Sequence, residues 1–169
     1  AADQGKIEAH EGNILDPDTL RRGLEGMDAI IHLVGIISEV AESTFENIHT
    51  LGTQNMVSQA KRAGVRRFVH MSALGTRENA ISRYHRTKWE AEESVRAAGL
   101  DYTIFRPSLI HGPEDHFTNL FARIIRLSPV VPVIGTGRAR YQPVSVEAVA
   151  TAFARSLTEP EAKGKSFDL

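Results

Sequence analysis

The sequence predicts an α/β fold of the doubly wound kind, in which helices cover both faces of a parallel sheet. Short apolar runs alternate with longer amphipathic runs along the chain. Three of the short runs, 28–35, 67–72 and 101–106, are apolar almost throughout, which is typical of strands buried on both faces. A helical pattern separates each of these runs from the next, and this order favours parallel strands joined by crossover helices.

The start of the chain predicts a weak strand over 7–10 and then a short helix. Asp16 can cap this helix, because its carboxylate accepts hydrogen bonds from the first free N–H groups, and Pro17 suits the first helical position. Two longer helices separate the three apolar strands. Ser43 is predicted to cap the first, which continues to Ala63.

Glycines mark the ends of these two longer helices. Gly64 follows the first of them, and glycine is the residue that most often ends a helix. The second runs from Ser82 to Ala98 and ends at Gly99. The third apolar strand then ends at Pro107, which cannot continue a central strand.

From about Asp115 the pattern changes, and we expect the beginning of a smaller lobe that faces the substrate. Its predicted elements are, in order, a helix near 117–127, strands near 131–134 and 140–144, a helix from Ser145 and a strand over 165–169. We therefore divide the chain into a main domain, 1–114, and a partial lobe, 115–169, which intertwines with it.

The composition is that of a folded globular chain and excludes several classes of protein. Its 169 residues are 41% hydrophobic and 24% charged, which fits one domain or one lobe of a larger protein. A net charge of −1 provides no basic face for nucleic acid, and the absence of Cys excludes a disulfide framework and a thiol nucleophile. No apolar stretch approaches the ~20 residues of a membrane-spanning helix, and the polar N-terminus shows no signal peptide, so we expect a cytoplasmic location.

The three apolar strands end near Gly35, Ser72 and Pro107. Ligands of doubly wound sheets bind beyond the carboxyl ends of the strands. Right-handed crossovers place these ends along one edge of the sheet. We therefore expect the three residues to lie side by side at the binding site.

Tyr84 and Lys88 are the sharpest chemical signal. Residues four apart share a face of a helix, so the phenol and the ammonium group should lie together. The ammonium favours the phenolate and is expected to lower the pKa of Tyr84. Such a tyrosine can exchange a proton with a substrate hydroxyl. The spacing alone also arises by chance, and its place after the strand that ends at Ser72 gives it weight.

Six segments together resemble the extended, atypical short-chain dehydrogenases/reductases of the NAD-dependent epimerase/dehydratase group. Within that group they are most similar to the branch of the Rossmann-type accessory subunit of respiratory complex I and its bacterial relatives. The segments are Gly12-Asn13-Ile14, IIHLVG at 30–35, FVHMSALG at 68–75, YHRTK at 84–88, RPSLIHGPEDHFTN at 106–119 and YQPVSVEAVA at 141–150. The resemblance implies a Rossmann-like fold without its first βαβ unit, so that 1–114 is a partial NAD(P)-binding domain.

The resemblance also implies roles for individual residues. Tyr84 corresponds to the catalytic acid/base, Lys88 to its electrostatic partner and Ser72 to an orienting group. The residues that it places at the dinucleotide are Asn13 and Ile14 at the adenine, Val34 and Gly35 beside a ribose, Pro107 and Ser108 near the nicotinamide, and Ile36, His49, Met71, Ser72 and Lys88. No metal site is expected, because the histidines form no ligand set.

Two departures from the family pattern leave the activity open. Leu74 stands where active members carry a Ser or Thr that polarises the substrate carbonyl, and Tyr84 follows Ser72 by only 12 residues. One hypothesis is an NAD(P)-dependent oxidoreductase or epimerase. The other is a non-catalytic nucleotide-binding subunit of a larger assembly. Leu74 favours the second hypothesis, and the intact Tyr84–Lys88 pair favours the first.

The expected ligands are NAD or NADP and a small-molecule substrate of unidentified class. The resemblance is also compatible with a homodimer and with peripheral association with a respiratory complex at the inner membrane. Neither glycine pair, Gly23 and Gly26 or Gly135 and Gly137, precedes a helix as a phosphate-binding loop does, and we interpret both pairs as turn glycines. We therefore expect the 169-residue chain by itself to bind a dinucleotide poorly, and micromolar affinity in calorimetry would contradict this.

Overall fold

The computed structural model describes residues 8–128, 130, 133, 136–138 and 140–169. The larger sheet of this part of the chain consists of β1 (Ala29–His32), β2 (Arg67–Met71), β3 (Asp101–Arg106) and β6 (Lys165–Asp168), in that order. Each neighbouring pair of strands is parallel. The predicted parallel sheet is therefore confirmed.

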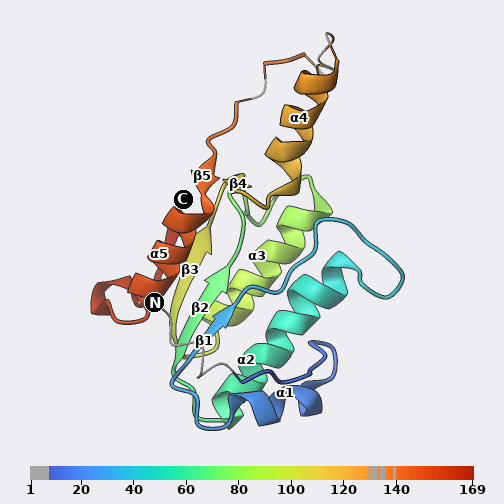
Figure 1. Ribbon diagram of the computed structural model, residues 1–169. Coiled ribbons are helices and arrows are strands. Elements are labelled where there is room, and N and C mark those ends of the chain that lie inside the picture. The colour runs from blue at the N-terminus through green and yellow to red at the C-terminus, as the bar shows by residue number, and fades with distance from the viewer. Residues whose placement is uncertain (1–7, 129, 131–132, 134–135, 139) are drawn as a thin grey trace.

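Helices cover both faces of this sheet (Figure 1). On one face lie α1 (Pro17–Leu24), α2 (Gly52–Arg62) and α3 (Arg83–Arg96), and on the other lies α5 (Val146–Ser156). This is the doubly wound arrangement that the sequence predicts.

A separate apolar cluster forms on each face of the sheet. On the first face, Phe68 and Ile104 of the strands pack with Val95 of α3, and all three are fully buried. On the second, Phe105 packs against Phe153 of α5 with 4.7 Å between ring centroids. Burial of each such side chain contributes about 1.5–3 kcal/mol to the stability of the fold. The two clusters therefore hold the strands in place beneath the site.

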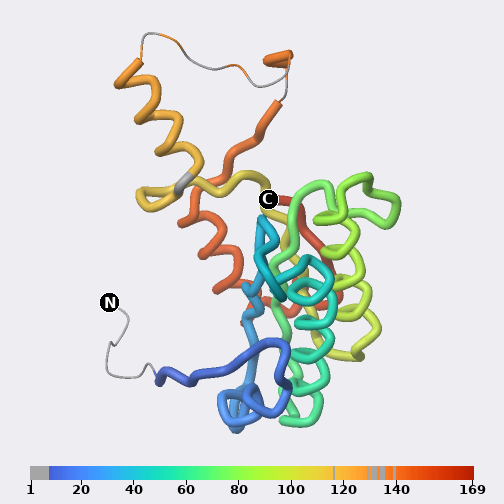
Figure 2. Tube along the Cα trace, turned by 90° about the vertical axis from the view of Figure 1, so that its right-hand side faces the viewer, coloured from blue at the N-terminus to red at the C-terminus, as the bar shows by residue number. Residues whose placement is uncertain are grey.

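A smaller part of the molecule lies beyond the carboxyl ends of the strands. There β4 (Ile110–His111) pairs in parallel with β5 (Val144–Ser145). Between them, α4 (His116–Leu127) projects away from the main sheet (Figures 1 and 2). After α5, a short 3₁₀ helix at Pro160–Ala162 leads the chain back into the main sheet as β6.

Several boundaries follow the predicted local signals. The Asp16 side chain accepts a hydrogen bond from the backbone N–H of Asp18 at 3.2 Å, and Pro17 is the first residue of α1. Gly64 and Gly99 follow α2 and α3 with φ of 76° and 71°, a left-handed conformation that glycine adopts without strain.

Of two further predicted strands, one does not form in the described residues and the other is shorter than predicted. Residues 8–10 form no strand, and Ile7 lies outside the described residues. The three described residues are exposed, so strand pairing there would bury little apolar surface. The strand predicted over 28–35 is too long, since β1 pairs with β2 only as far as His32. Ile36 N donates to Nε2 of His49 at 3.1 Å.

The predicted cap at Ser43 is also wrong. Ser43 pairs with Val40 in an antiparallel bridge, and the helix begins after it. The hydroxyl of Thr44 caps the helix instead, accepting a hydrogen bond from Asn47 N at 3.1 Å. The first part of the helix, η2 (Glu46–Leu51), has π geometry and continues directly into α2. Such segments often occur at functional sites, and this one carries His49.

In the smaller part, the strand predicted over 140–144 is wrong in extent, since only Val144 and Ser145 find a pairing partner. The strand predicted over 131–134 falls mostly outside the described residues. Of the glycines interpreted as turn residues, Gly26 and Gly137 lie in turns, Gly23 lies within α1, and Gly135 is outside the described residues.

Candidate active site

A cavity of about 210 Å³ opens at the carboxyl ends of β1, β2 and β3. Gly35, Ser72 and Pro107 all line it, as predicted. The full lining consists of Leu33, Gly35, Ile36, Ile37, Met71, Ser72, Ala73, Tyr84, Lys88, Pro107, Ser108 and Ile110. The structure therefore brings three strand ends together with the Tyr84–Lys88 pair of α3.

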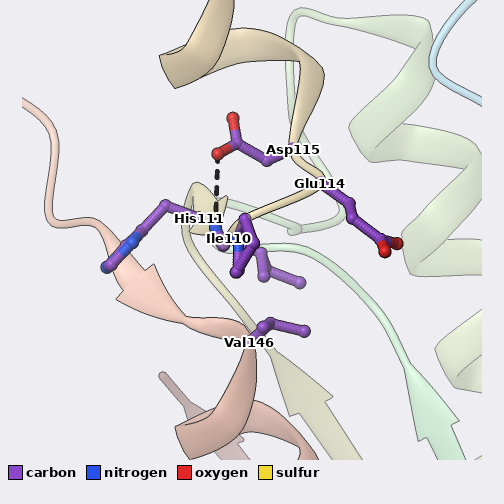
Figure 3. A pocket seen from close by; sticks show the side chains of 7 residues that line it. Ile110, His111, Glu114, Asp115 and Val146 are labelled. Atoms are coloured by element: carbon purple, nitrogen blue, oxygen red, sulfur yellow. Dashed lines mark hydrogen bonds between the residues drawn. The ribbon is translucent and has the colours of Figure 1, made fainter.

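A second cavity of about 390 Å³ shares Ile110 with the first and lies beneath α4 (Figure 3). It is the larger of the two, but its most acidic group is occupied. Asp115 accepts hydrogen bonds from Thr118 and from Gly112 N. These bonds, of which that from Thr118 has the largest effect, lower the pKa of Asp115 to about 2. Asp115 therefore caps α4, and the smaller cavity carries the candidate chemistry.

The ring of Tyr84 is held by three other rings. Phe45, His49 and His85 each meet it nearly edge to face, at centroid distances of 5.7, 5.2 and 5.0 Å. Edge-to-face contacts of this kind are favourable and directional. They fix the direction of the phenol toward the cavity without a hydrogen bond that would compete with a substrate for its oxygen.

The expectation that Lys88 lowers the pKa of Tyr84 is wrong. Burial raises the pKa of the Tyr84 phenol, because the half-buried ring disfavours the phenolate. The Lys88 ammonium instead donates a hydrogen bond to Met71 O at 3.0 Å. At neutral pH Tyr84 is therefore a phenol, which suits it to give a proton.

Lys88 is a cation held in the interior. Its side chain is buried, and burial lowers the pKa of Lys88 to about 8, although the charge of Glu92 opposes this shift. At neutral pH most of the population is still protonated. Among the described residues only Met71 O accepts from it, so two donors of the ammonium group are available to a ligand.

Gly35 keeps this ammonium open to the cavity. A Cβ atom at position 35 would lie 3.1 Å from Lys88 Nζ and 3.7 Å from His49 Nε2. A side chain there would crowd both groups. The site thus has open space at Gly35 beside the buried ammonium of Lys88. The free N–H donors of this ammonium fit the ribose hydroxyls of a dinucleotide.

His49 connects the loop after β1 to α3. Its Nε2 lies within hydrogen-bond distance of both Ile36 N and Ile36 O, and its Nδ1 lies 3.0 Å from Oγ1 of Thr87. It does not line the cavity, so its position supports a structural contribution to the site. The sequence motif places it at the dinucleotide only by resemblance.

Ser72 is backed by an ionic network in the interior. Glu92 is fully buried, and its carboxylate accepts from Arg106 at 2.6 and 2.8 Å and from Arg96 at 2.6 Å. Burial would raise the pKa of Glu92, but hydrogen bonds from Arg106, Ser72 and Arg96 outweigh it and lower that pKa. The network thus lies close to Ser72, whose hydroxyl donates to Thr76 Oγ1.

Thr76 supplies a hydroxyl next to Ser72, two residues beyond Leu74. Its Oγ1 lies 3.4 Å from Ser72 Oγ and 3.5 Å from His85 Nδ1. Leu74 is partly exposed, and its backbone N–H donates to Pro107 O at 2.9 Å. This bond ties the loop after β2 to the end of β3.

The residues expected at the adenine lie apart from the cavity lining. Asn13 Oδ1 accepts from Leu15 N at 2.9 Å, and Ile14 O accepts from Asn55 Nδ2 at 2.9 Å. Both bonds join this segment to itself and to α2. Val34 is exposed and does not line the cavity either.

Sequence reasoning missed Glu92, Arg106 and Thr76. Glu92 was detectable, because it continues the four-residue spacing from Tyr84 and Lys88 along the buried face of α3. A carboxylate on that face requires a cation, and Arg96, one turn further along α3, and Arg106, at the end of β3, are the candidates. Thr76 gave no such signal, since only the fold of its loop brings it to Ser72.

Three buried histidines feel the charge of Lys88, and they make stability depend on pH. Burial, followed by the charge of Lys88, lowers the pKa of His32 and of His49 to about 4. Burial, followed by the neighbouring His32, places the pKa of His70 well below 6.5. Each is neutral when folded but binds a proton below pH 6.5 when unfolded, so stability falls as the pH drops from 6.5 toward 4.

We expect His32→Gln to remove part of this pH dependence. Because His32 stays neutral in the folded protein, its contribution lowers the free energy of unfolding by about 2 kcal/mol between pH 6.5 and pH 5. Glutamine does not titrate, so the variant lacks this contribution. Urea unfolding at pH 7, 6 and 5 measures the slope. The exposed His111→Gln is the control and should leave it unchanged. An unaltered slope in His32→Gln would show that His32 is not neutral and buried as described.

Comparison with known proteins supports the arrangement. A sequence family described as NAD(P)H-binding matches residues 1–160. Subunit 9 of the mitochondrial NADH dehydrogenase (ubiquinone) 1 alpha subcomplex from Mus musculus is 32% identical over 166 residues, 98% of this chain and 44% of that protein. A ceramide reductase from Caulobacter vibrioides is 33% identical over 129 residues, 76% of this chain and 40% of that protein. The chain thus spans less than half the length of these relatives.

Solved structures of sugar-nucleotide enzymes share the fold. A dTDP-glucose 4,6-dehydratase from Streptomyces venezuelae with NAD bound has a TM-score of 0.76 and 25% identity, covering 93% of this chain and 56% of that chain. A nucleoside-diphosphate-sugar epimerase from Staphylococcus aureus has a TM-score of 0.77 at 18% identity, covering 98% and 56%. The Rossmann-like fold and the family resemblance predicted from the sequence are confirmed.

Proposed function

The chain belongs to the NAD(P)H-binding family, and from this premise we propose that it carries the reactive half of an NAD(P)-dependent oxidoreductase or epimerase site. One observation carries the proposal. Tyr84, Lys88 and Ser72 line a single cavity with Gly35 and Pro107, where three parallel strands end. A cavity at this edge is where doubly wound sheets bind their ligands.

The residues divide the chemistry among them. When bound, a nicotinamide exchanges hydride with a carbon of the substrate. Tyr84 gives a proton to, or takes one from, the oxygen on that carbon. Lys88 donates to ribose hydroxyls with the two N–H groups that Met71 O does not use, and so positions the nicotinamide beside Tyr84. Ser72, whose hydroxyl lies 3.4 Å from Thr76 Oγ1, orients the substrate oxygen.

We assign the remaining predicted contacts by position. Ile36, Met71, Pro107 and Ser108 line the same cavity and would surround the nicotinamide and its ribose. Asn13, Ile14 and Val34 would contact the more distant adenosine half. In this proposal 1–114 form the nucleotide-binding part. Residues 115–169 contribute the substrate side through the part that lies beyond the strand ends, and intertwine with the main sheet through α5 and β6.

The alternative is a nucleotide-binding subunit without catalysis, with NAD or NADP as a structural ligand. A ligand that binds only the folded state stabilises it. Leu74, which replaces a hydroxyl-bearing residue of active family members, favours this alternative. The likeness to a subunit of a mitochondrial NADH dehydrogenase also favours it, and a peripheral place in such a complex would follow.

Cofactor titration of the complete gene product tests the binding part of the proposal. Lys88→Ala should weaken binding of NADH or NADPH about 10–100-fold, because a hydrogen bond to a charged group contributes about 1.5–3 kcal/mol. Fluorescence of the reduced nicotinamide measures the affinity. Lys61→Ala, on the exposed face of α2, is the matched control. If both variants bind like the native protein, Lys88 does not contact the dinucleotide.

A further inference from the structure

α4 has an apolar face without a partner in the described part of the chain. Its apolar residues Phe117, Leu120, Phe121, Ile124 and Ile125 follow the spacing of one helix face. None of the described side chains of α4 is buried, whereas α2, α3 and α5 each bury several. Leu120 and Ile125 are 54% and 55% exposed.

The opposite face of the same helix is polar and cationic. Asn119, Arg123 and Arg126 lie there, and both arginines are exposed. A helix with a broad apolar face and arginines on the other is typical of helices that lie in a membrane interface. Its 12 residues are too few to span a bilayer, and no described helix is long and apolar enough to do so.

The charge of the surrounding segment is one-sided. Residues 116–146 contain four arginines, Arg123, Arg126, Arg138 and Arg140, and no Asp or Glu, although the whole chain carries a net charge of −1. Exposed apolar side chains continue through this segment at Val130, Val133, Tyr141 and Val146. Apolar exposure and the absence of acidic side chains thus coincide in one stretch of the chain, which Glu114, Asp115 and Glu147 bound.

The position of this segment leaves it accessible. α4 extends beyond the carboxyl ends of the strands, away from the sheet and its covering helices (Figures 1 and 2). The cavity beneath α4, shown in Figure 3, lies between this segment and the candidate active site.

From these observations we infer that residues 116–146 dock on an anionic lipid surface, with the apolar face of α4 at the headgroup boundary and the arginines among the lipid phosphates. Charge decides between this occupant and a covering segment of protein. A protein cover requires apolar complementarity but no depletion of acidic residues, whereas an anionic bilayer attracts arginines and repels carboxylates. The cavity of the candidate active site then opens near the membrane surface.

Sedimentation with lipid vesicles tests the inference on the complete gene product. The native protein should bind vesicles of phosphatidylcholine mixed with phosphatidylglycerol, bind phosphatidylcholine alone far more weakly, and lose affinity as salt is raised. Arg123→Gln with Arg126→Gln should reduce affinity about 30-fold, since each arginine near an anionic surface contributes roughly fivefold. Arg21→Gln with Arg22→Gln on α1 is the matched control and should change little.

A second pair of variants tests the apolar face. Leu120→Gln with Ile125→Gln should abolish sedimentation with the mixed vesicles, and Ile81→Gln, at an equally apolar position that is 93% exposed, should not. Circular dichroism verifies that each variant is folded. The inference is overturned if the native protein does not bind the mixed vesicles, as when another protein segment covers α4. It is also overturned if the Leu120/Ile125 variant binds like the native protein.

Discussion

Tyr84→Phe is expected to lower turnover by about 10²–10⁴-fold and to leave cofactor affinity nearly unchanged. The phenol contributes only the proton step, and its ring is held by Phe45, His49 and His85 through contacts that phenylalanine also makes. Because no described hydrogen bond to the phenol is lost, the fold should keep its stability. The measurement is hydride transfer from reduced cofactor to ketone and nucleotide-sugar acceptors, with cofactor affinity determined in parallel.

Two further variants make this result decisive. Tyr102→Phe removes a phenol from β3, away from the cavity, and should be silent in both measurements. Lys88→Ala should lower both turnover and affinity, because in this proposal the ammonium binds the ribose and thereby positions the nicotinamide for hydride transfer. Equal loss of cofactor affinity in Tyr84→Phe and Lys88→Ala would mean that the phenol binds the cofactor rather than moving a proton.

The same variants separate the two proposed functions. If the protein is a nucleotide-binding subunit without catalysis, Tyr84→Phe changes nothing measurable. Lys88→Ala then lowers thermal stability in the presence of the dinucleotide, because the bound ligand stabilises the folded state less. The distinction does not depend on knowing the substrate.

The sequence predicts the sheet well because its signals are local. Continuous apolar runs bounded by Gly and Pro locate β2 and β3, and β3 matches the predicted 101–106 throughout. The convergence of Gly35, Ser72 and Pro107 follows from crossover handedness alone. These features depend on pattern and on chain topology, both of which can be read from one sequence.

What the sequence could not predict depends on side chains that meet only after folding. His49, for example, bonds the backbone of Ile36, 13 residues before it in the chain, in the loop that follows β1. The π geometry of η2, which carries His49, has no known sequence signature. The predicted direction of the Tyr84 pKa shift was also wrong, because spacing along a helix does not reveal that folding buries the phenol.

Glu92→Ala is expected to destabilise the protein by about 3–5 kcal/mol, because it removes one partner of a buried ionic network and leaves the others uncompensated. Glu92 is fully buried and pairs with both Arg106 and Arg96. Arg106 ends β3, directly before Pro107 at the cavity, so its loss of a partner should also disturb the site. Urea unfolding at pH 7 measures the change in free energy.

Glu93→Ala provides the matched control for this prediction. Glu93 neighbours Glu92 on α3 and bonds Arg96 at 2.6 Å, but its side chain is 54% exposed. A solvent-exposed pair contributes about 0–1 kcal/mol, so the same truncation one residue further along should cost little. A small cost in both variants would mean that Arg106 and Arg96 reach solvent when Glu92 is removed. In that case the network beneath Ser72 contributes neither to stability nor to the orientation of the serine hydroxyl.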